Sequence, residues 1–278
     1  MSRRTAERRA RSSGAARRSR APAFVALAGL AVVAALGVAY LALRPDESAP
    51  LAAPVHPRYP DLTMGALEEI TVGIRPDGTL SVRFPATIVN IGDAEFLVRA
   101  ARDSPLVEDW RVVQRIPDAD DLFSNRDTGA NLVWGGDGHD HWHVREVEAH
   151  RIETMDGEIL GEVVKAGFCF FDTDHVRPDI PGSPETHAHS ARGCGGRIDM
   201  GVHMGLSVGW GDTYPSQMLD QTISVPELPD GRYVVRMIAD PSDWFAETDE
   251  ANNEVATEIE VGTGADGVRT VEVIGDAG

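Results

Sequence analysis

Three histidines alternate within the stretch GHDHWHVREVEAH, residues 138–150, at positions His139, His141 and His143. Side chains two residues apart point to the same side of an extended chain, whereas a helix would spread them around its axis. Three neutral imidazoles on one side suit Cu(II) or Zn(II). The outer two would start about 13 Å apart on an ideal strand, so the neighbouring glycines must let the backbone bend. An exposed histidine cluster or a structural metal site is the alternative.

Lys165 is the only lysine of the 278 residues, against 25 arginines, and lies in the apolar stretch GEVVKAGFCFFDT, residues 161–173. A compositional bias towards arginine would explain why lysine is rare. A buried lysine, however, can lose its proton and act as a nucleophilic amine, which arginine cannot do. The sequence therefore leaves two interpretations, a chance survivor or a residue whose chemistry requires an amine.

One further motif resembles a catalytic signature without the structural context that the signature requires. The stretch GLSVG, residues 205–209, satisfies G-x-S-x-G, the pattern of the serine-hydrolase nucleophile elbow. That pattern is meaningful only on a strand–turn–helix of an α/β sheet. No helical pattern follows this stretch, so we interpret it as part of a β structure.

Short apolar-alternating segments must position these residues. LSVRFPATIVNIG, RVVQRI, HVREVEAHRIE, GRYVVRMIADP and EVATEIEV carry period-two or β-branched patterns between turn signals. The sequence predicts an all-β fold, a β-sandwich catalytic domain with long loops over residues 60–262. Residues 174–201 read as one long loop, and only residues 215–221 could form a helix of more than two turns.

The N-terminal region predicts one transmembrane helix before this domain. Residues 1–20 contain eight arginines and one acid, and residues 21–43 contain no charge, which is long enough for a membrane-spanning helix. The arginines place the N-terminus in the cytoplasm, so the domain would lie outside a bacterial cell on a single-pass anchor. A cleaved signal peptide and a secreted domain are the alternative. Residues 44–59 read as a Pro/Ala linker, and residues 263–278 as a C-terminal tail.

Charge and cysteine content restrict the partners. Nine of the 26 basic residues but only one of the 44 acidic residues lie in residues 1–44, which leaves 17 basic against 43 acidic residues beyond. Such a surface attracts cationic ligands and repels nucleic acid, although it also serves solubility. Cys169 and Cys194 would form one disulfide outside the cell; no zinc-finger spacing is present.

Taken in order, HDHWHVREVEAH, KAGFCFFDT and GLSVGWGDTY resemble the lysyl oxidase family. LSVRFPATIVNIGDAEFL at 80–97, YPDL at 59–62 and AETDEANN at 246–253 are also similar to segments of that family. The resemblance covers roughly residues 59–262. Two family motifs are altered. The Trp-His that precedes the family's copper histidines is missing here, where the sequence reads LVWGGDGHD, and the family's Q-W-I-D-I-T is replaced by QTISV at 221–225. These departures concern the substrate pocket.

The resemblance implies a copper enzyme with a cofactor made from its own side chains. His139, His141 and His143 fall on the family's copper ligands. Lys165 and Tyr214 fall on the two residues that fuse into lysine tyrosylquinone, so the lone lysine would have a covalent role. Burial would favour the neutral amine that this addition needs.

The implied reaction is oxidative deamination of a primary amine to an aldehyde with O₂, releasing ammonia and hydrogen peroxide. For the general base we expect Asp212, with His203 as a weaker candidate; Asp212 could instead be a turn cap. The acidic exterior favours polyamines, small amines or lysine side chains as the cationic substrate.

A second, calcium site is also implied, where the start and end of the domain would meet. Carboxylate, amide and carbonyl oxygens are the ligands that calcium prefers, with an acidic Asx turn as the alternative. The expected ligands are Asp61, Leu62 through its carbonyl, Glu247, Asp249, Asn252 and Asn253.

Two other function classes use the same histidines. A non-catalytic, metal-binding β-sandwich at the cell surface would need neither Lys165 nor Tyr214. A zinc hydrolase would work without O₂. Only the oxidase requires the lysine and the tyrosine to meet.

Overall fold

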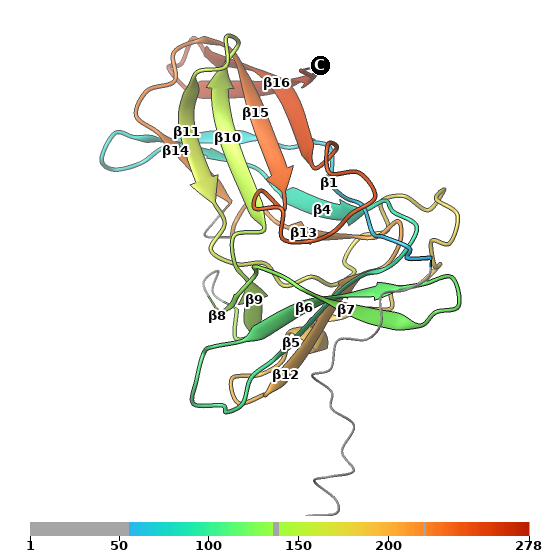
Figure 1. Ribbon diagram of the computed structural model, residues 1–278. Coiled ribbons are helices and arrows are strands. Elements are labelled where there is room, and N and C mark those ends of the chain that lie inside the picture. Colours follow the sequence, from blue (N-terminus) through green and yellow to red (C-terminus); the bar gives the residue numbers. More distant parts are fainter. Residues whose placement is uncertain (1–55, 136–138, 219–220, 278) are drawn as a thin grey trace, which may run out of the picture. The chain divides into compact units, whose positions relative to one another are not determined.

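The computed structural model describes residues 56–135, 139–218 and 221–277 (Figure 1). Within these ranges the regular structure is all β, with one 3₁₀ turn, η1 (Ala191–Cys194), and no α-helix. The all-β prediction is therefore confirmed. The predicted transmembrane segment and most of the predicted linker lie outside the described residues. No helix among the described residues has the length and apolar character needed to span a membrane.

The largest sheet has five antiparallel strands in the order β11-β10-β15-β16-β17, and Figure 1 shows β11, β10, β15 and β16 side by side. Their bounds are β10 Glu148–Thr154, β11 Ile159–Val164, β15 Gly231–Ala239, β16 Glu254–Thr263 and β17 Arg269–Asp276. Residues 263–278, expected to be a tail, thus contribute β17, which pairs with β16. The alternating, weakly apolar sequence of this edge strand gave too little signal for a strand prediction.

Two three-stranded sheets pack against this sheet through contacts of β1 with β15, β14 with β11 and β2 with β17. One contains β1 (Leu62–Met64), β4 (Ala86–Asn90) and β13 (Gly211–Tyr214); the other contains β2 (Thr71–Ile74), β3 (Leu80–Arg83) and β14 (Thr222–Val225). Alternating apolar residues of both layers are buried between them, among them Val82, Phe84, Ile88, Ile152 and Val235. This layering is consistent with the β-sandwich prediction.

A four-stranded sheet, β12-β5-β6-β7, and a hairpin, β8-β9, complete the fold. The strands are β5 Phe96–Ala101, β6 Arg111–Pro117, β7 Phe123–Asp127, β8 Leu132–Trp134, β9 Trp142–Val144 and β12 Gly201–Leu206. Trp142 of β9 is fully buried and packs edge-on against Trp110 and Trp134 at ring separations of 4.9 and 5.3 Å. This aromatic cluster fixes the hairpin that carries the last of the three histidines.

The long loop before β12 is confirmed: between β11 and β12, η1 and isolated bridges of Phe168 and Asp174 are the only regular structure. The predicted disulfide between Cys169 and Cys194 is present and holds the far part of this loop against the chain that follows β11. The helix considered for residues 215–221 does not form over 215–218, which make a turn. Pro215 there follows β13 directly, and residues 219–220 lie outside the described ranges.

Candidate functional site

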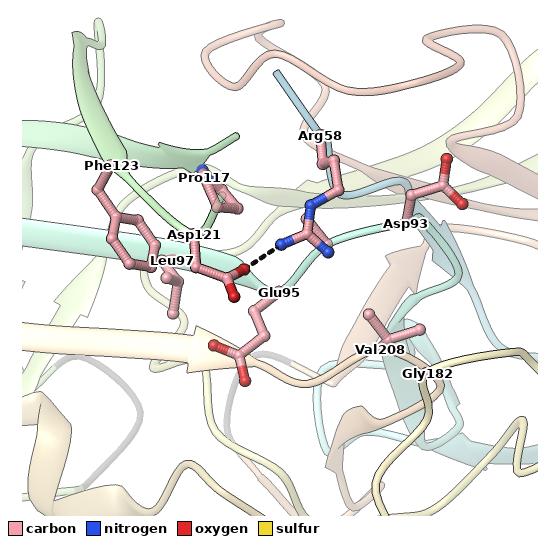
Figure 2. A pocket seen from close by; sticks show the side chains of 10 residues that line it. Arg58, Asp93, Glu95, Leu97, Pro117, Asp121, Phe123, Gly182 and Val208 are labelled. Atoms are coloured by element: carbon pink, nitrogen blue, oxygen red, sulfur yellow. Dashed lines mark hydrogen bonds and ion pairs between the residues drawn. The ribbon is translucent and has the colours of Figure 1, made fainter. Parts of the chain in front are cut away.

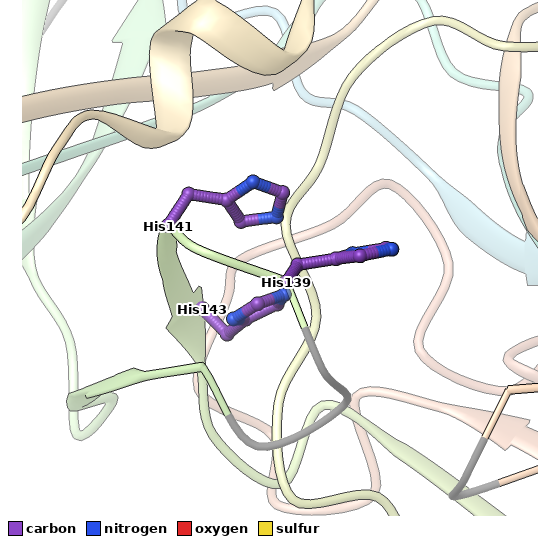
Figure 3. A group of neighbouring side chains, drawn as sticks. All are labelled: His139, His141 and His143. Atoms are coloured by element: carbon purple, nitrogen blue, oxygen red, sulfur yellow. The ribbon is translucent and has the colours of Figure 1, made fainter.

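The side chains of His139, His141 and His143 converge. Their candidate ligand nitrogens all lie within 4.8 Å of one another, and Figure 3 shows the three rings on the same side of the segment. Only His143 belongs to strand β9; the chain bends at Asp140 and His141 before it. The sequence required the backbone to bend here, and the bend brings the first and third rings closer than an ideal strand would allow. Three convergent imidazoles fit a copper or zinc ion.

Gly167 lets the segment that follows Lys165 pass directly against the buried His143. A Cβ atom at Gly167 would lie 2.5 Å from His143 Cβ, closer than such atoms can approach, and 3.2 Å from Val133 Cγ1, which is a tight contact. Glycine at this position is thus required by the position of the histidine.

We therefore expect Gly167→Ala to displace His143 and weaken Cu(II) binding roughly 10- to 100-fold, as is usual when a group supporting a metal ligand is altered. Competition titration of Cu(II) measures the effect. Gly201→Ala is the matched control, because its Cβ would meet nothing closer than Ala100 O at 3.8 Å. Equal Cu(II) affinities in the two variants would contradict this account.

Lys165 lies directly after β11 and is 1% exposed, as the notably apolar surroundings of its sequence suggested. Its Nζ lies 3.4 Å from the centroid of the Tyr214 ring and 4.8 Å from that of Phe168. It donates to Glu148 Oε2 at 3.2 Å. The amide of Gln221, in the orientation that satisfies both of its groups, accepts from the same Nζ at 2.7 Å.

Tyr214 ends strand β13 and is 3% exposed. Its position is fixed by backbone pairing with Ala86 of β4. The backbone N–H of Cys169 donates to the tyrosine hydroxyl at 3.0 Å, and the Phe168 ring stacks on the phenol at 4.4 Å. The His139 ring centroid lies 6.3 Å from that of Tyr214. The phenol is therefore close to both the lysine amine and the histidine group.

Asp212 lies two residues before Tyr214 on β13, so both side chains point into the same buried space. Burial raises the pKa of Asp212 well above its ordinary value, while the Lys165 charge and the Phe171 backbone N–H act against this shift. No donor among the described residues reaches either Asp212 oxygen with normal hydrogen-bond geometry. It is no turn cap, and such a carboxylate is well suited to take up a proton.

Two other residues that the sequence offered, His203 as a base and Ser207 as a nucleophile, are unsuitable for these roles. His203 is on the solvent side of β12, and partial burial together with Arg99 and Arg115 lowers its pKa. Ser207 of the G-x-S-x-G stretch is fully buried, and its N–H and hydroxyl both bind Asp172, at 2.8 and 2.7 Å. That serine is a structural hydroxyl between two strands, as its surroundings in the sequence suggested.

Glu148 and His150 of β10 extend the site beyond the residues found from the sequence. Glu148 is fully buried between Lys165 and His150, with one carboxylate oxygen hydrogen-bonded to each. Burial alone would raise the pKa of Glu148, but Lys165 and then His150 outweigh it and lower the pKa to about 2. An acid and a histidine two residues apart on the buried face of a strand are the signal that could have revealed this pair.

The residues expected to bind calcium meet at the junction of the start and end of the domain. The Leu62 N–H donates to Glu247, Thr63 Oγ1 donates to the Asn252 carbonyl at 2.7 Å, and Asn253 Nδ2 donates to Glu247 Oε1 at 3.0 Å. Asp249 accepts from the Ala251 N–H in an Asx turn and interacts electrostatically with Asp61.

This junction contains oxygens that fit a cation. The side-chain oxygens Asp61 Oδ1, Asn252 Oδ1 and Asn253 Oδ1 are buried and have no hydrogen-bond partner among the described residues. Burial raises the pKa of Asp61, and it raises the pKa of Glu247 to about 8. Three buried acceptors and two carboxyl groups that resist ionisation match what a bound cation would compensate.

A separate cavity of about 380 Å³ lies elsewhere and includes none of the residues expected to carry the chemistry. Figure 2 shows Arg58 paired with Asp121 in this cavity, beside Phe123 and near Glu95. Its acidic lining makes it a poor site for anions. Reactive side chains and potential metal ligands are instead combined around Lys165 and Tyr214.

Comparison with known proteins identifies the same region. The family described as lysyl oxidase matches residues 123–266, about half of the chain. Lysyl oxidase homolog 4 of Mus musculus is 26% identical over 175 residues, which are 63% of this chain and 18% of that protein. Lysyl oxidase homolog 2 of Homo sapiens is 30% identical over 122 residues, 44% of this chain and 14% of that protein. The alignments thus span less than a fifth of these relatives.

Proposed function

The chain belongs to the lysyl oxidase family, and from this premise we propose that it is a copper-dependent oxidase of primary amines. It would convert a cationic primary amine to the aldehyde with O₂, releasing ammonia and hydrogen peroxide. The observation that carries the proposal is the 3.4 Å separation between Lys165 Nζ and the Tyr214 ring centroid. At this separation the amine stands over the ring that it would attack, close to the range of about 3–3.5 Å in which two atoms can react.

His139, His141 and His143 are the residues that would hold the copper ion, since their nitrogens already converge. Lys165 and Tyr214 would provide lysine tyrosylquinone. Copper and O₂ supply the oxidising power that forms this quinone, whose electrophilic carbonyl supplies the chemistry for capturing and oxidising an amine.

The surrounding residues orient the tyrosine and exclude water. The Cys169 N–H fixes the phenol oxygen, and Phe168 covers one face of the ring while Lys165 lies over it. Phe168 and Phe170 are both fully buried, with ring centroids 4.9 Å apart. These contacts restrict ring rotation and keep the surroundings of Nζ dry.

Asp212 is the residue we assign as the base that removes the α-proton of the bound amine. Its raised pKa follows from burial, and a carboxylate in this state is a stronger proton acceptor than an exposed one. The excess of acidic residues beyond Arg44 would concentrate cationic substrates, such as a small amine, a polyamine or a lysine side chain. We also propose that residues 21–43 anchor the chain in the membrane with this domain outside.

Peptide mapping after maturation tests the proposed function. Protein incubated with Cu(II) in air should yield one covalently joined pair of peptides containing Lys165 and Tyr214, and it should release peroxide when given an alkylamine. Protein kept without O₂ is the control and should yield two separate peptides. Separate peptides after aerobic maturation, together with tight Cu(II) binding, would instead support a non-catalytic metal-binding module.

We further propose that Asp61, the Leu62 carbonyl, Glu247, Asn252 and Asn253, with Asp249 near the edge, hold Ca²⁺. Calcium at about 100 times its Kd should stabilise the domain by about 2.7 kcal/mol. That corresponds to a Tm increase of roughly 5–10 °C for a domain of this size. Thermal unfolding with Ca²⁺ and with a chelator measures it.

Glu247→Gln is the informative variant for this calcium prediction, because it keeps the shape of the side chain but loses the charge. It should remove most of the calcium-dependent Tm increase, whereas Glu260→Gln on the exposed part of β16 should retain it. A wild-type Tm that does not respond to calcium would exclude the site.

A further inference from the structure

Glu148 has no role in the proposed amine oxidation, yet it contacts Lys165 Nζ, the nitrogen that would form the cross-link. Its Oε2 lies 3.2 Å from Lys165 Nζ, and its Oε1 is hydrogen-bonded to His150 Nε2. The exposed fractions of Glu148, Lys165 and His150 are 0%, 1% and 1%. The His150 ring packs on Phe84 at 5.0 Å. A carboxylate, an amine and an imidazole thus form a row sealed from solvent.

This row creates a chemical conflict at Lys165. An ionised Glu148 favours the ammonium form of the lysine, since a buried carboxylate requires a compensating charge. An ammonium nitrogen has no electron pair to give, so it cannot add to the oxidised ring of Tyr214. The proton must leave Nζ before the cross-link can form. Bulk water cannot take it directly, because the amine is buried.

We propose that Glu148 is the proton acceptor for Lys165 during formation of the Lys165–Tyr214 cross-link. This inference rests on the proposed function. The ammonium proton moves from Nζ to Oε2, which neutralises both groups. The freed electron pair then forms the C–N bond to a ring carbon of Tyr214 that O₂ and copper have already oxidised.

The rest of the step balances without another base. The two oxygens of the ortho-quinone form of Tyr214 take up one hydrogen from the nitrogen and one from the attacked carbon. A second O₂ then removes two electrons and two protons and becomes H₂O₂. The proton transfer is uphill by itself, because Lys165 and His150 stabilise the ionised Glu148, and the C–N bond that the freed electron pair forms draws it forward.

Neighbouring groups keep the transfer directed. Gln221 accepts from Nζ at 2.7 Å in its satisfied amide orientation and donates to the Phe84 carbonyl at 3.2 Å, so the amine stays aimed at the ring. His150 holds the other Glu148 oxygen. The remaining charged group that faces this row is Asp212 of β13, which interacts electrostatically with both Lys165 and Glu148. Asp212 competes little for the amine proton, because neither of its oxygens has hydrogen-bond geometry to Nζ, whereas Glu148 Oε2 accepts from that nitrogen.

The experiment follows cross-link formation in full-length Glu148→Gln after Cu(II) and air are added to copper-free protein. Mass spectrometry of the joined Lys165–Tyr214 peptides gives the rate at pH 6–10. At pH 7 we expect the variant to react about 100-fold more slowly than wild type, within the usual range for loss of a general base. Its rate should recover as the pH rises and the amine loses its proton without the help of Glu148, whereas the wild-type rate should change little.

Controls separate this role from a structural one. Cu(II) affinity of Glu148→Gln should match wild type, since the three histidines are unchanged. Glu162→Gln on β11, which pairs with the half-exposed Arg151, should cross-link normally. Glu148→Asp keeps a carboxylate and should cross-link at pH 7 at a rate within about tenfold of wild type. This comparison still tests the role of the carboxylate if Glu148→Gln folds poorly.

The outcomes are distinct. Cross-linking of Glu148→Gln at the wild-type rate with the wild-type pH dependence would overturn the role of Glu148 and leave the proposed function standing. The same holds if Glu148→Asp folds but is as slow as the Gln variant. Absence of a cross-link in wild type would overturn the proposed function and this inference together.

Discussion

Lys165→Arg should abolish both the cross-link and amine-dependent peroxide release, with activity at least about 10³-fold below wild type. Arginine keeps the positive charge beside Glu148, but its guanidinium stays protonated in proteins and is not a nucleophile. The side chain is buried with its nitrogen 3.4 Å from the Tyr214 ring centroid, so no nearby group can replace it. Lys165 is the only lysine in the sequence.

The Arg variant is a sharper test than an apolar one. Lys165→Met would leave Glu148 buried without its cationic partner, at a cost of about 3–5 kcal/mol, and a loss of activity could then reflect unfolding. Arg should cost only about 1–3 kcal/mol for overpacking. Intact mass, Cu(II) binding and thermal unfolding are measured alongside peroxide release. Peroxide release above a tenth of the wild-type rate in folded Lys165→Arg would refute the covalent role of this lysine.

Asp212→Asn should lower kcat for amine oxidation by about 10²- to 10⁴-fold, the range for removing a general base, while the cross-link still forms. In wild type the activity should fall as the pH drops through the raised pKa of Asp212, because the protonated acid cannot accept the α-proton. The variant should lose this acidic limb of the pH profile. Steady-state peroxide release from pH 5 to 9 measures both effects.

The same variant should be more stable than wild type at neutral pH. A carboxyl whose pKa is raised by folding binds more protons in the folded state than in the unfolded state. Wild-type stability therefore falls as the pH rises from the unfolded pKa, about 3.9, through the folded one. Asn carries no such penalty, so Tm of the copper-free variant should exceed that of wild type at pH 7 and converge with it at pH 4. A variant that is both active and less stable would count against Asp212 as the base.

The sequence predicted the residues whose chemistry is rare and local. Alternating histidines and a single lysine in an apolar stretch stand out without any knowledge of the fold, and the structure brings Lys165 and Tyr214 together. Gln221 could not be found in this way, and the spacing of Glu148 to His150 is only a weak signal. Glu148 lies on β10 and Gln221 lies just before β14, so their contacts with Lys165 depend on strand pairing between distant segments.

Secondary structure around the site was harder to predict for a related reason. The Gly-Asp-Thr-Tyr-Pro stretch contains strong turn formers, yet pairing with β4 holds Gly211–Tyr214 extended. Residues 139–143 alternate like a strand, yet they bend before β9. In both cases tertiary contacts outweigh the local preference of the sequence.

Cys169 has two roles that are linked in time. Its sulfur is bonded to Cys194, and its backbone N–H holds the Tyr214 hydroxyl. Disulfides form and persist in oxidising compartments, so the segment whose N–H holds the Tyr214 hydroxyl is fully braced only where this bond can form. With the domain exported as we propose, maturation would wait for the disulfide, and the peroxide that accompanies it would be released outside the cell.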